Sequence, residues 1–266
     1  MEPHPAHKTE VRVYSGMEAL STAAGELFTE TARTSAAVRG RFAVALSGGR
    51  TPLPTYRLLS QPPYSELVPW DKTHVFWGDE RCVPPDDPRN NAATALDELL
   101  NHVLIPANQI HRIVCEASPR EAADRYEAVL RNFFQDRGPR FDLIFLGIGE
   151  DGHTASLFPG SPALDEQERW VKEAYQPEQR MHRVTLTAVA INAASRIAFL
   201  VQGRDKSTIL QKIFANAGAP ERLPAQHIRP NRGELIWLID EEAASGLKRT
   251  GLQGAENLIP FRFPRS

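Results

Sequence analysis

Five short runs of apolar residues are spread along the chain, each four to eight residues long and bounded by Gly, Asp or Pro. They occupy residues 42–46, 74–77, 141–148, 197–202 and 235–239. Runs of this length that are apolar almost throughout are typical of strands buried on both faces of a parallel sheet. We therefore expect a strand at each of these positions.

Longer segments between these runs have apolar residues at spacings of three and four, which indicates amphipathic helices. Residues 17–38 and 120–134 are the clearest, and shorter helices are expected over residues 53–59 and 91–99. The predicted buried face of the second helix consists of Ala122, Ala123, Tyr126, Val129, Leu130 and Phe133. Strands that alternate with helices predict an α/β fold: a doubly wound, mostly parallel, Rossmann-like sheet with helices on both faces.

The chain has no internal repeat and no linker rich in Ser, Gly or charge, so we expect a single domain over residues 1–266. Residues 1–8 and 261–266 are expected to be loose termini. The Pro-rich residues 61–69 and the polar residues 165–180 are expected to be surface loops.

Composition narrows the class of protein. The 266 residues are 41% hydrophobic and carry a formal charge of -2, which allows a buried core and argues against a surface that coats DNA or RNA. The chain has no apolar run as long as a membrane span and no signal-peptide pattern at its start. For Cys82 and Cys115 we expect isolated reduced thiols rather than a disulfide. These features predict a soluble cytoplasmic protein with no nucleic-acid or membrane partner.

Candidate chemistry follows the apolar runs, because open α/β sheets bind ligands beyond the carboxyl ends of their strands. The first run is followed by Ser47, Gly48, Gly49, Arg50 and Thr51. Two glycines let backbone N–H groups approach an anion, and a helix begins just after them. The alternative is an ordinary strand-to-helix turn with Thr51 as the helix cap.

The second run ends in Gly78, Asp79, Glu80 and Arg81. We expect Arg81 to bind an anionic ligand and Asp79 to orient it, although a surface ion network explains these residues equally well. The Pro- and Asp-rich loop that follows is placed to cover the site, and Asn91 begins the next predicted helix.

The third run leads into GIGEDGHTASLFP, residues 147–159. His153, in a Gly-flanked loop beyond a buried strand, is a candidate general base, and Asp151 is placed to orient its imidazole. The alternative is a capping Asp beside a solvent-exposed His. Further on, Arg183 begins an alternating segment that predicts an edge strand, and Lys206 begins a helix whose dipole its charge opposes, a conflict that an anion would relieve. No HExxH, CxxC or GxSxG pattern occurs, so we expect no metal and no other cofactor.

These segments together resemble the 6-phosphogluconolactonase family over nearly the whole chain. The matching blocks are SGGRTP (47–52), GDERCVP (78–84), GIGEDGHTASLFPG (147–160), RVTLT (183–187), the turn 203–206 and LPA (223–225). The family usually has Ser-Asn where this chain has Asn90-Asn91. Since Asn also caps helices, we expect the same function.

The resemblance implies a fold related to that of the glucosamine-6-phosphate deaminases. The activity it implies is hydrolysis of 6-phospho-D-glucono-1,5-lactone to 6-phospho-D-gluconate, in the oxidative pentose phosphate pathway, with no cofactor, by a monomer or weak homodimer. The catalytic candidates are His153, Asp151, Asp79 and Arg81. The candidates for substrate binding are Ser47, Gly48, Gly49, Arg50, Thr51, Arg81, Asn91, Arg183 and Lys206.

Two alternatives stay open. A deaminase has DGHIAFNEP in the histidine loop, with a Glu at the position of Phe158, and a Tyr at the position of Arg81. Both differences favour a lactonase. A non-catalytic sugar-phosphate-binding protein would keep the cations but has no need of His153.

Overall fold

The computed structural model describes residues 8–116, 118–135, 138–215 and 222–247. Its larger sheet is parallel throughout, with the strand order β1-β9-β8-β5-β2-β3. The strands are β1 (Lys8–Tyr14), β2 (Phe42–Leu46), β3 (Thr73–Trp77), β5 (Leu143–Leu146), β8 (Arg196–Val201) and β9 (Glu234–Asp240). All five apolar runs are therefore strands, and the predicted parallel α/β fold is confirmed.

The first strand, β1, was not predicted. Lys8 begins it, so the expectation of a loose terminus is wrong at that residue, while residues 1–7 and 261–266 lie outside the described part of the chain. The strand lies at one edge of the sheet and pairs with β9. Only Val11 and Val13 are buried in it, so it lacks the continuous apolar run of the inner strands.

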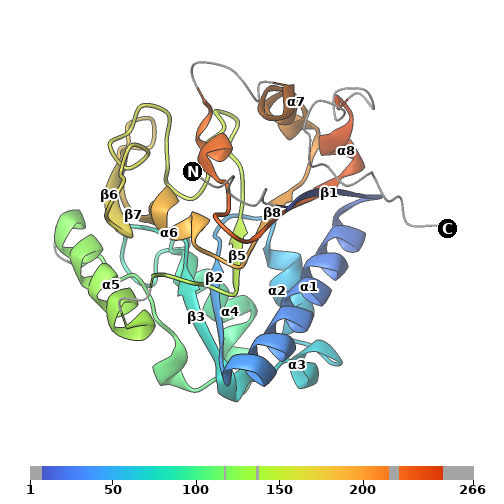
Figure 1. The fold of residues 1–266 in the computed structure, drawn as a ribbon, viewed down its shortest axis with the longest axis vertical. Helices are drawn as coiled ribbons and strands as arrows, with labels where there is room; N and C mark the ends of the chain where they lie inside the picture. Colours follow the sequence, from blue (N-terminus) through green and yellow to red (C-terminus); the bar gives the residue numbers. More distant parts are fainter. Residues whose placement is uncertain (1–7, 117, 136–137, 216–221, 248–266) are drawn as a thin grey trace, which may run out of the picture.

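Helices cover both faces of this sheet, as Figure 1 shows. The long helix α1 (Met17–Arg39) packs on one face, where the ring of Phe28 contacts those of Phe42 and Phe145. Helix α5 (Pro119–Phe134) packs on the other face, where Phe134 contacts Phe76. The doubly wound arrangement is thus confirmed.

The remaining helices are short. They are α2 (Leu53–Leu59), α3 (Tyr64–Leu67), α4 (Asn91–Glu98), α6 (Ala188–Asn192), α7 (Ser207–Ala215) and α8 (Glu241–Ala244). Single 3₁₀ turns cover Trp70–Lys72, Leu100–His102, Ala107–Gln109, Arg204–Lys206 and Pro224–His227.

Two predictions about these helical segments were partly wrong. Residues 61–69, predicted as a surface loop, contain α3. On α5, Val129 was predicted to be buried but is 39% exposed. Phe134 is buried instead, because its ring packs against that of Phe76 in the sheet.

A second, antiparallel sheet has the order β4-β7-β6 and was not predicted. Its strands are β4 (Asp79–Arg81), β6 (Val171–Gln176) and β7 (Met181–Leu186). The expectation of a single sheet is therefore wrong, and so is the assignment of residues 165–180 to a loop, because β6 lies within them. Residues 183–187 were predicted as an edge or shorter strand. The strand is present as β7, but it is central, with a partner on each side.

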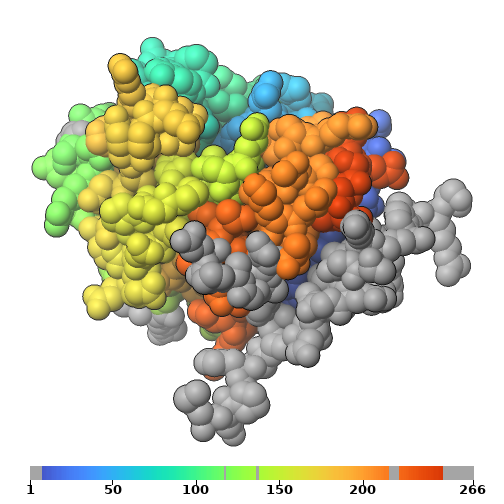
Figure 2. All heavy atoms as spheres, turned by 90° about the horizontal axis from the view of Figure 1, so that it is seen from above, coloured from blue at the N-terminus to red at the C-terminus, as the bar shows by residue number. Residues whose placement is uncertain are grey.

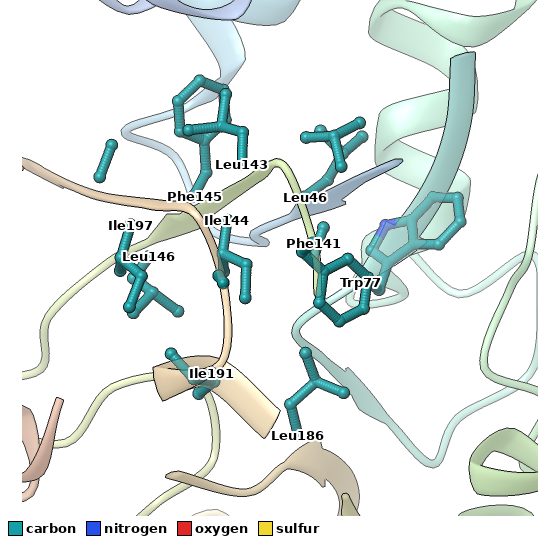
Figure 3. Close-up of a cluster of buried hydrophobic side chains, with 14 of the residues drawn as sticks. Leu46, Trp77, Phe141, Leu143, Ile144, Phe145, Leu146, Leu186, Ile191 and Ile197 are labelled. Atoms are coloured by element: carbon teal, nitrogen blue, oxygen red, sulfur yellow. The ribbon is translucent and has the colours of Figure 1, made fainter. Parts of the chain in front are cut away.

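The second sheet is attached to the first through a shared apolar core. Figure 3 shows Leu186 of β7 and Ile191 of α6 on the same side of the larger sheet as Ile144 and Leu146. All four side chains are at most 1% exposed. The backbone N–H of Leu186 also donates to the carbonyl oxygen of Gly78 over 2.8 Å, which ties the second sheet to the end of β3. The position of β4 is thus set by the core.

Cys82 and Cys115 form a disulfide, so the expectation of separate thiols is wrong. Their Cα atoms are 5.1 Å apart, within the range that such a bond requires. The contact arises because the segment before α5 runs beside β3, where His111 donates its backbone N–H to the carbonyl oxygen of Val75. Cys115 is thereby brought next to the end of β4.

The order of the strands also defines where a ligand can bind. From β2 the chain moves to β3 at one edge, and from β5 it moves through β8 to β9 on the other side. The connections that leave β2 and β5 at their carboxyl ends therefore diverge. Crevices at such switch points are the usual ligand sites of open α/β sheets.

Candidate active site

A cavity of about 540 Å³ lies at this switch point. Seen from above in Figure 2, the segments that follow β2 (light blue), β5 (yellow-green) and β8 (orange) lie side by side. Nearly all the predicted site residues line the cavity: Ser47, Gly48, Gly49, Arg50, Thr51, Asp79, Arg81, Asn91, His153, Arg183 and Lys206. Asp151, predicted as a catalytic residue, does not line the cavity, but it lies beside His153, as expected of a residue that orients the imidazole.

The loop after β2 is held by a buried tyrosine. The hydroxyl of Tyr56 donates to the carbonyl oxygen of Ser47 over 2.7 Å and accepts its backbone N–H over 3.1 Å. Gly49 adopts φ +91°, a conformation that side chains rarely allow. Helix α2 has no side-chain cap, so Thr51 does not act as the helix cap. The backbone of this loop is thus fixed while Arg50 stays exposed.

Gly48 is needed because Asn91 packs directly against it. A Cβ atom at residue 48 would lie 1.8 Å from Oδ1 of Asn91. The Asn91 side chain donates from Nδ2 to the carbonyl oxygen of Asp79 over 2.9 Å. Asn90 caps α4 by accepting the N–H of Ala93, which confirms that Asn serves as a cap here.

Asp79 is buried and paired with Arg183 rather than with Arg81. Its Oδ2 accepts the hydroxyl of Ser156 over 2.6 Å and lies 3.6 Å from Nη1 of Arg183. Arg81 instead donates from Nη1 to the carbonyl oxygen of Arg89 over 2.6 Å. Of these two arginines, Arg183 therefore has a carboxylate partner, and Arg81 is held by a neutral oxygen.

Arg81 and Arg183 face each other directly in the β4–β7 ladder. Among the described residues, the buried Nε atom of each guanidinium has no hydrogen-bond partner. Burial lowers the pKa of Arg183 and the nearby Arg81 lowers it further, while Asp79 opposes both effects. Like charges at paired positions are unfavourable, so an anion between these groups would be strongly stabilised.

His153 is held by Asp151. Nδ1 of the imidazole lies 2.5 Å from Oδ1 of Asp151, which also accepts the backbone N–H of His153 over 3.0 Å. Partial burial acts to raise the pKa of Asp151, but these hydrogen bonds outweigh it and keep that pKa below its usual value. Gly149 makes room for the pair, since a Cβ atom there would lie 2.1 Å from Nδ1.

The turn after β8 carries Lys206 into the cavity. Gly203 adopts φ +95°, and its N–H donates to the carboxylate of Asp240 at the end of β9. Lys206 lies in a 3₁₀ turn immediately before α7, with Nζ 3.3 Å from Oδ2 of Asp205. Gln202, Gly203 and Asp205 also line the cavity and were not predicted. Their position directly after β8 was the signal that would have found them.

No group of three or more His, Cys, Asp or Glu side chains suited to a metal ion occurs in the part of the chain that the structure describes. Within the same residues, no helix is long and apolar enough to cross a membrane.

Comparisons with known proteins agree with this geometry. Residues 15–237 match the family described as glucosamine-6-phosphate isomerases/6-phosphogluconolactonase. The chain is 44% identical over 216 residues to the 6-phosphogluconolactonase of Synechocystis, covering 80% of this chain and 87% of that one. The solved 6-phosphogluconolactonase of Trypanosoma cruzi superposes with a TM-score of 0.80 at 28% identity, over 92% of this chain and 99% of the other.

A monomeric glucosamine-6-phosphate deaminase shares the fold, with a TM-score of 0.76 at 22% identity, over 89% of this chain and 99% of the other. The chain belongs to the family of glucosamine-6-phosphate isomerases and 6-phosphogluconolactonases.

Proposed function

We propose that the protein hydrolyses 6-phospho-D-glucono-1,5-lactone to 6-phospho-D-gluconate, as in the oxidative pentose phosphate pathway. One observation carries the proposal: a single cavity joins the Asp151-supported imidazole of His153 to the facing guanidinium groups of Arg81 and Arg183. The first is a proton acceptor and the second an anion site. Relatives named 6-phosphogluconolactonase at up to 44% identity support the same substrate.

The imidazole of His153 acts as the general base. Nδ1–H of His153 donates a hydrogen bond to the carboxylate of Asp151, so Nε2 is left as an acceptor. A water that donates to Nε2 attacks the lactone carbonyl carbon, and Nε2 takes one of its protons. Asp151 then stabilises the resulting imidazolium through the same contact.

Collapse of the tetrahedral intermediate breaks the bond between the carbonyl carbon and the ring oxygen. The imidazolium returns its proton to that oxygen, which becomes a hydroxyl of the product. Negative charge on the carbonyl oxygen is stabilised by the backbone N–H groups of Gly48 and Gly49, which belong to the loop that Tyr56 holds. No covalent enzyme intermediate is needed.

The phosphate end of the substrate binds to the cations of the cavity. Arg81 and Arg183 supply two adjacent guanidinium groups, each with a free Nε atom among the described residues. Arg50 and Lys206 reach the cavity from the loops after β2 and β8. Binding at this remote end positions the reacting carbonyl beside His153.

Deamination is the second candidate, and Phe158 weighs against it. Its ring centroid lies 4.8 Å from that of His153, at the position where the deaminase pattern has a Glu. An apolar ring neither donates nor accepts the proton that sugar ring opening requires. A purely binding role leaves the supported imidazole of His153 without a purpose.

The proposal is tested by following acid release from the lactone in a pH-stat, corrected for spontaneous hydrolysis, in parallel with ammonia release from glucosamine 6-phosphate. We expect enzyme-dependent acid release and no ammonia. Ammonia without acid release would select the deaminase. Binding of 6-phosphogluconate with neither reaction would select the binding protein.

Two further predictions accompany this function. We infer a cytoplasmic location and a monomer or weak homodimer that acts on a free sugar-phosphate lactone. Size-exclusion chromatography with light scattering measures the assembly, and a tetramer would contradict it.

A further inference from the structure

We infer that Glu80 is a positioning residue for this cavity: its buried carboxylate fixes strand β4 to the first turn of α4 and thereby places Arg81 and Asn91. The residue does not line the cavity, and no role was predicted for it. The kinetic part of the inference rests on the proposed function.

Both oxygens of the Glu80 carboxylate are used. Oε1 accepts the backbone N–H groups of Arg81 over 2.8 Å and of Asn91 over 2.7 Å. Oε2 accepts that of Ala92 over 2.8 Å. The side chain is fully enclosed, with the residue 1% exposed. One carboxylate therefore satisfies two free N–H groups at the start of α4 and one in β4.

These bonds reach the cavity through their neighbours. Asn91, held by Glu80 through its backbone, packs its carboxamide against Gly48 and donates to the carbonyl oxygen of Asp79. Arg81, held in the same way, projects its guanidinium into the cavity. The loop after β2, strand β4 and α4 thus meet at Asn91, and Glu80 holds the backbone of Asn91 in place.

The arrangement requires an ionised carboxylate. Three N–H donors point at its two oxygens, and a carboxylate has only acceptor sites. A protonated carboxyl or a Gln side chain turns one of the two positions into a donor. At least one backbone N–H then faces another donor and loses its hydrogen bond.

The surroundings of Glu80 bring its ionisation near neutrality. Burial raises the pKa of Glu80 to about 7. The hydrogen bonds from the three backbone N–H groups lower this pKa, and the negative charge of Asp79 raises it. The other ionisable groups close to it are the adjacent Arg81, Arg183 on β7 and the buried hydroxyl of Tyr126 on α5. The Glu80 side chain is thus mostly the carboxylate at pH 8, and protonation through the range around pH 7 turns one of its two acceptor positions into a donor.

The test compares Glu80→Gln with a matched control, Asp142→Asn. Asp142 is also a buried carboxylate that accepts a backbone N–H, that of Ala43 over 2.8 Å, but it lies at the amino end of β5, away from the cavity. At pH 8 we expect Glu80→Gln to raise KM for the lactone roughly ten- to hundredfold, the scale of one hydrogen bond to a charged group, with kcat changed less. We expect Asp142→Asn to lower Tm without changing KM.

A second readout needs no turnover. In the wild type, the amide ¹H–¹⁵N resonances of Arg81, Asn91 and Ala92 should shift together with a midpoint near pH 7, and in Glu80→Gln this common shift should vanish. If the wild type hydrolyses the lactone while folded Glu80→Gln keeps the wild-type KM, the inference is overturned. Independent midpoints for the three wild-type amides overturn it as well, even if the variant does not fold.

Failure of the proposed function is recognised separately. If the wild type hydrolyses no lactone, calorimetric titration with 6-phosphogluconate replaces the kinetic arm. Binding at least tenfold weaker in Glu80→Gln than in Asp142→Asn then supports the positioning role. Equal binding in the two variants rejects it.

Discussion

The imidazole Nδ1 of His153 and the carboxylate Oδ1 of Asp151 lie 2.5 Å apart, and the same oxygen accepts the backbone N–H of His153. The carboxylate therefore fixes both the loop and the ring with one atom. The other ring nitrogen of His153, Nε2, is left free to take a proton from the attacking water. The two residues are expected to act as a unit.

Replacement of His153 by Ala should lower kcat by roughly 10²–10⁴-fold, the usual contribution of a positioned acid–base group. Asp151→Asn should lower kcat to a smaller extent, because the ring stays in place but the imidazolium loses its counter-charge. Steady-state lactone hydrolysis measures both effects. His102→Ala is the control, since His102 is exposed, hydrogen-bonds the carbonyl oxygen of Asp97 and does not line the cavity. Near-normal turnover in folded His153→Ala would remove it from the base role.

Arg81→Ala should raise KM strongly for the phosphorylated lactone and leave that for glucono-1,5-lactone nearly unchanged. The physical reason is that Arg81 and Arg183 are paired in the β4–β7 ladder, and the phosphate places negative charge beside both guanidinium groups. Arg57→Ala serves as the control because Arg57 pairs with Glu98 on the exposed surface. Equal loss with both lactones would show that Arg81 is not a phosphate anchor.

Reduction of the Cys82–Cys115 disulfide should lower the free energy of unfolding. The bond links residues 33 positions apart, and a closed loop of that size restricts the unfolded chain by about 2–4 kcal/mol. Urea unfolding with and without a phosphine reductant measures the change. The double variant Cys82→Ser/Cys115→Ser should resemble the reduced protein and show no response to reductant. Identical unfolding curves for the oxidised protein and the double variant would contradict the prediction.

His111 should make the fold sensitive to mild acid. Burial, with a smaller contribution from His74, lowers its pKa to about 4 from an ordinary 6.5. Between pH 6.5 and 4, His111 is protonated in the unfolded chain but stays neutral in the folded protein. Protonation therefore favours the unfolded state, and the free energy of unfolding falls as the pH falls. Urea midpoints at pH 7 and pH 5 give the slope.

His111→Phe should flatten that slope. The ring of His111 stacks on Phe76 with centroids 4.3 Å apart, so a phenyl ring can occupy its place without titrating. An unchanged pH dependence in this variant would assign the acid sensitivity to other groups.

The inner strands and the strand-end motifs could be read from the sequence for one physical reason. A strand such as β2 is buried on both faces and has no polar residue, so it stands out from its surroundings. Its neighbours in space end at the same edge of the sheet, so their following loops converge on one cavity. Once the strands were taken to be parallel, it followed that the loops after them would lie at one edge of the sheet.

Strands with mixed composition were missed. In β6, the consecutive Lys172 and Glu173 lie between the buried Val171 and Ala174, and the segment has the composition of a surface loop. Its pairing with β7, which hides one edge and one face, is a tertiary effect that local composition does not encode.

The disulfide and the role of Glu80 were missed because each depends on two segments far apart in the chain. Cys82 and Cys115 meet only after the segment before α5 has packed along β3. Glu80 stands between two candidate residues in the sequence, yet its function arises from the start of α4, which approaches it from the opposite side.

The pairing of β1 with β9 has a consequence for synthesis of the protein. Lys8 is matched to Glu234 and Tyr14 to Asp240, and within the described part of the chain β9 is the only strand beside β1. On the ribosome, Val11 and Val13 emerge long before the strand that will bury them. The growing polypeptide therefore carries β1 unpaired until β9 has been synthesised, and that edge is where a nascent chain needs protection from association with others.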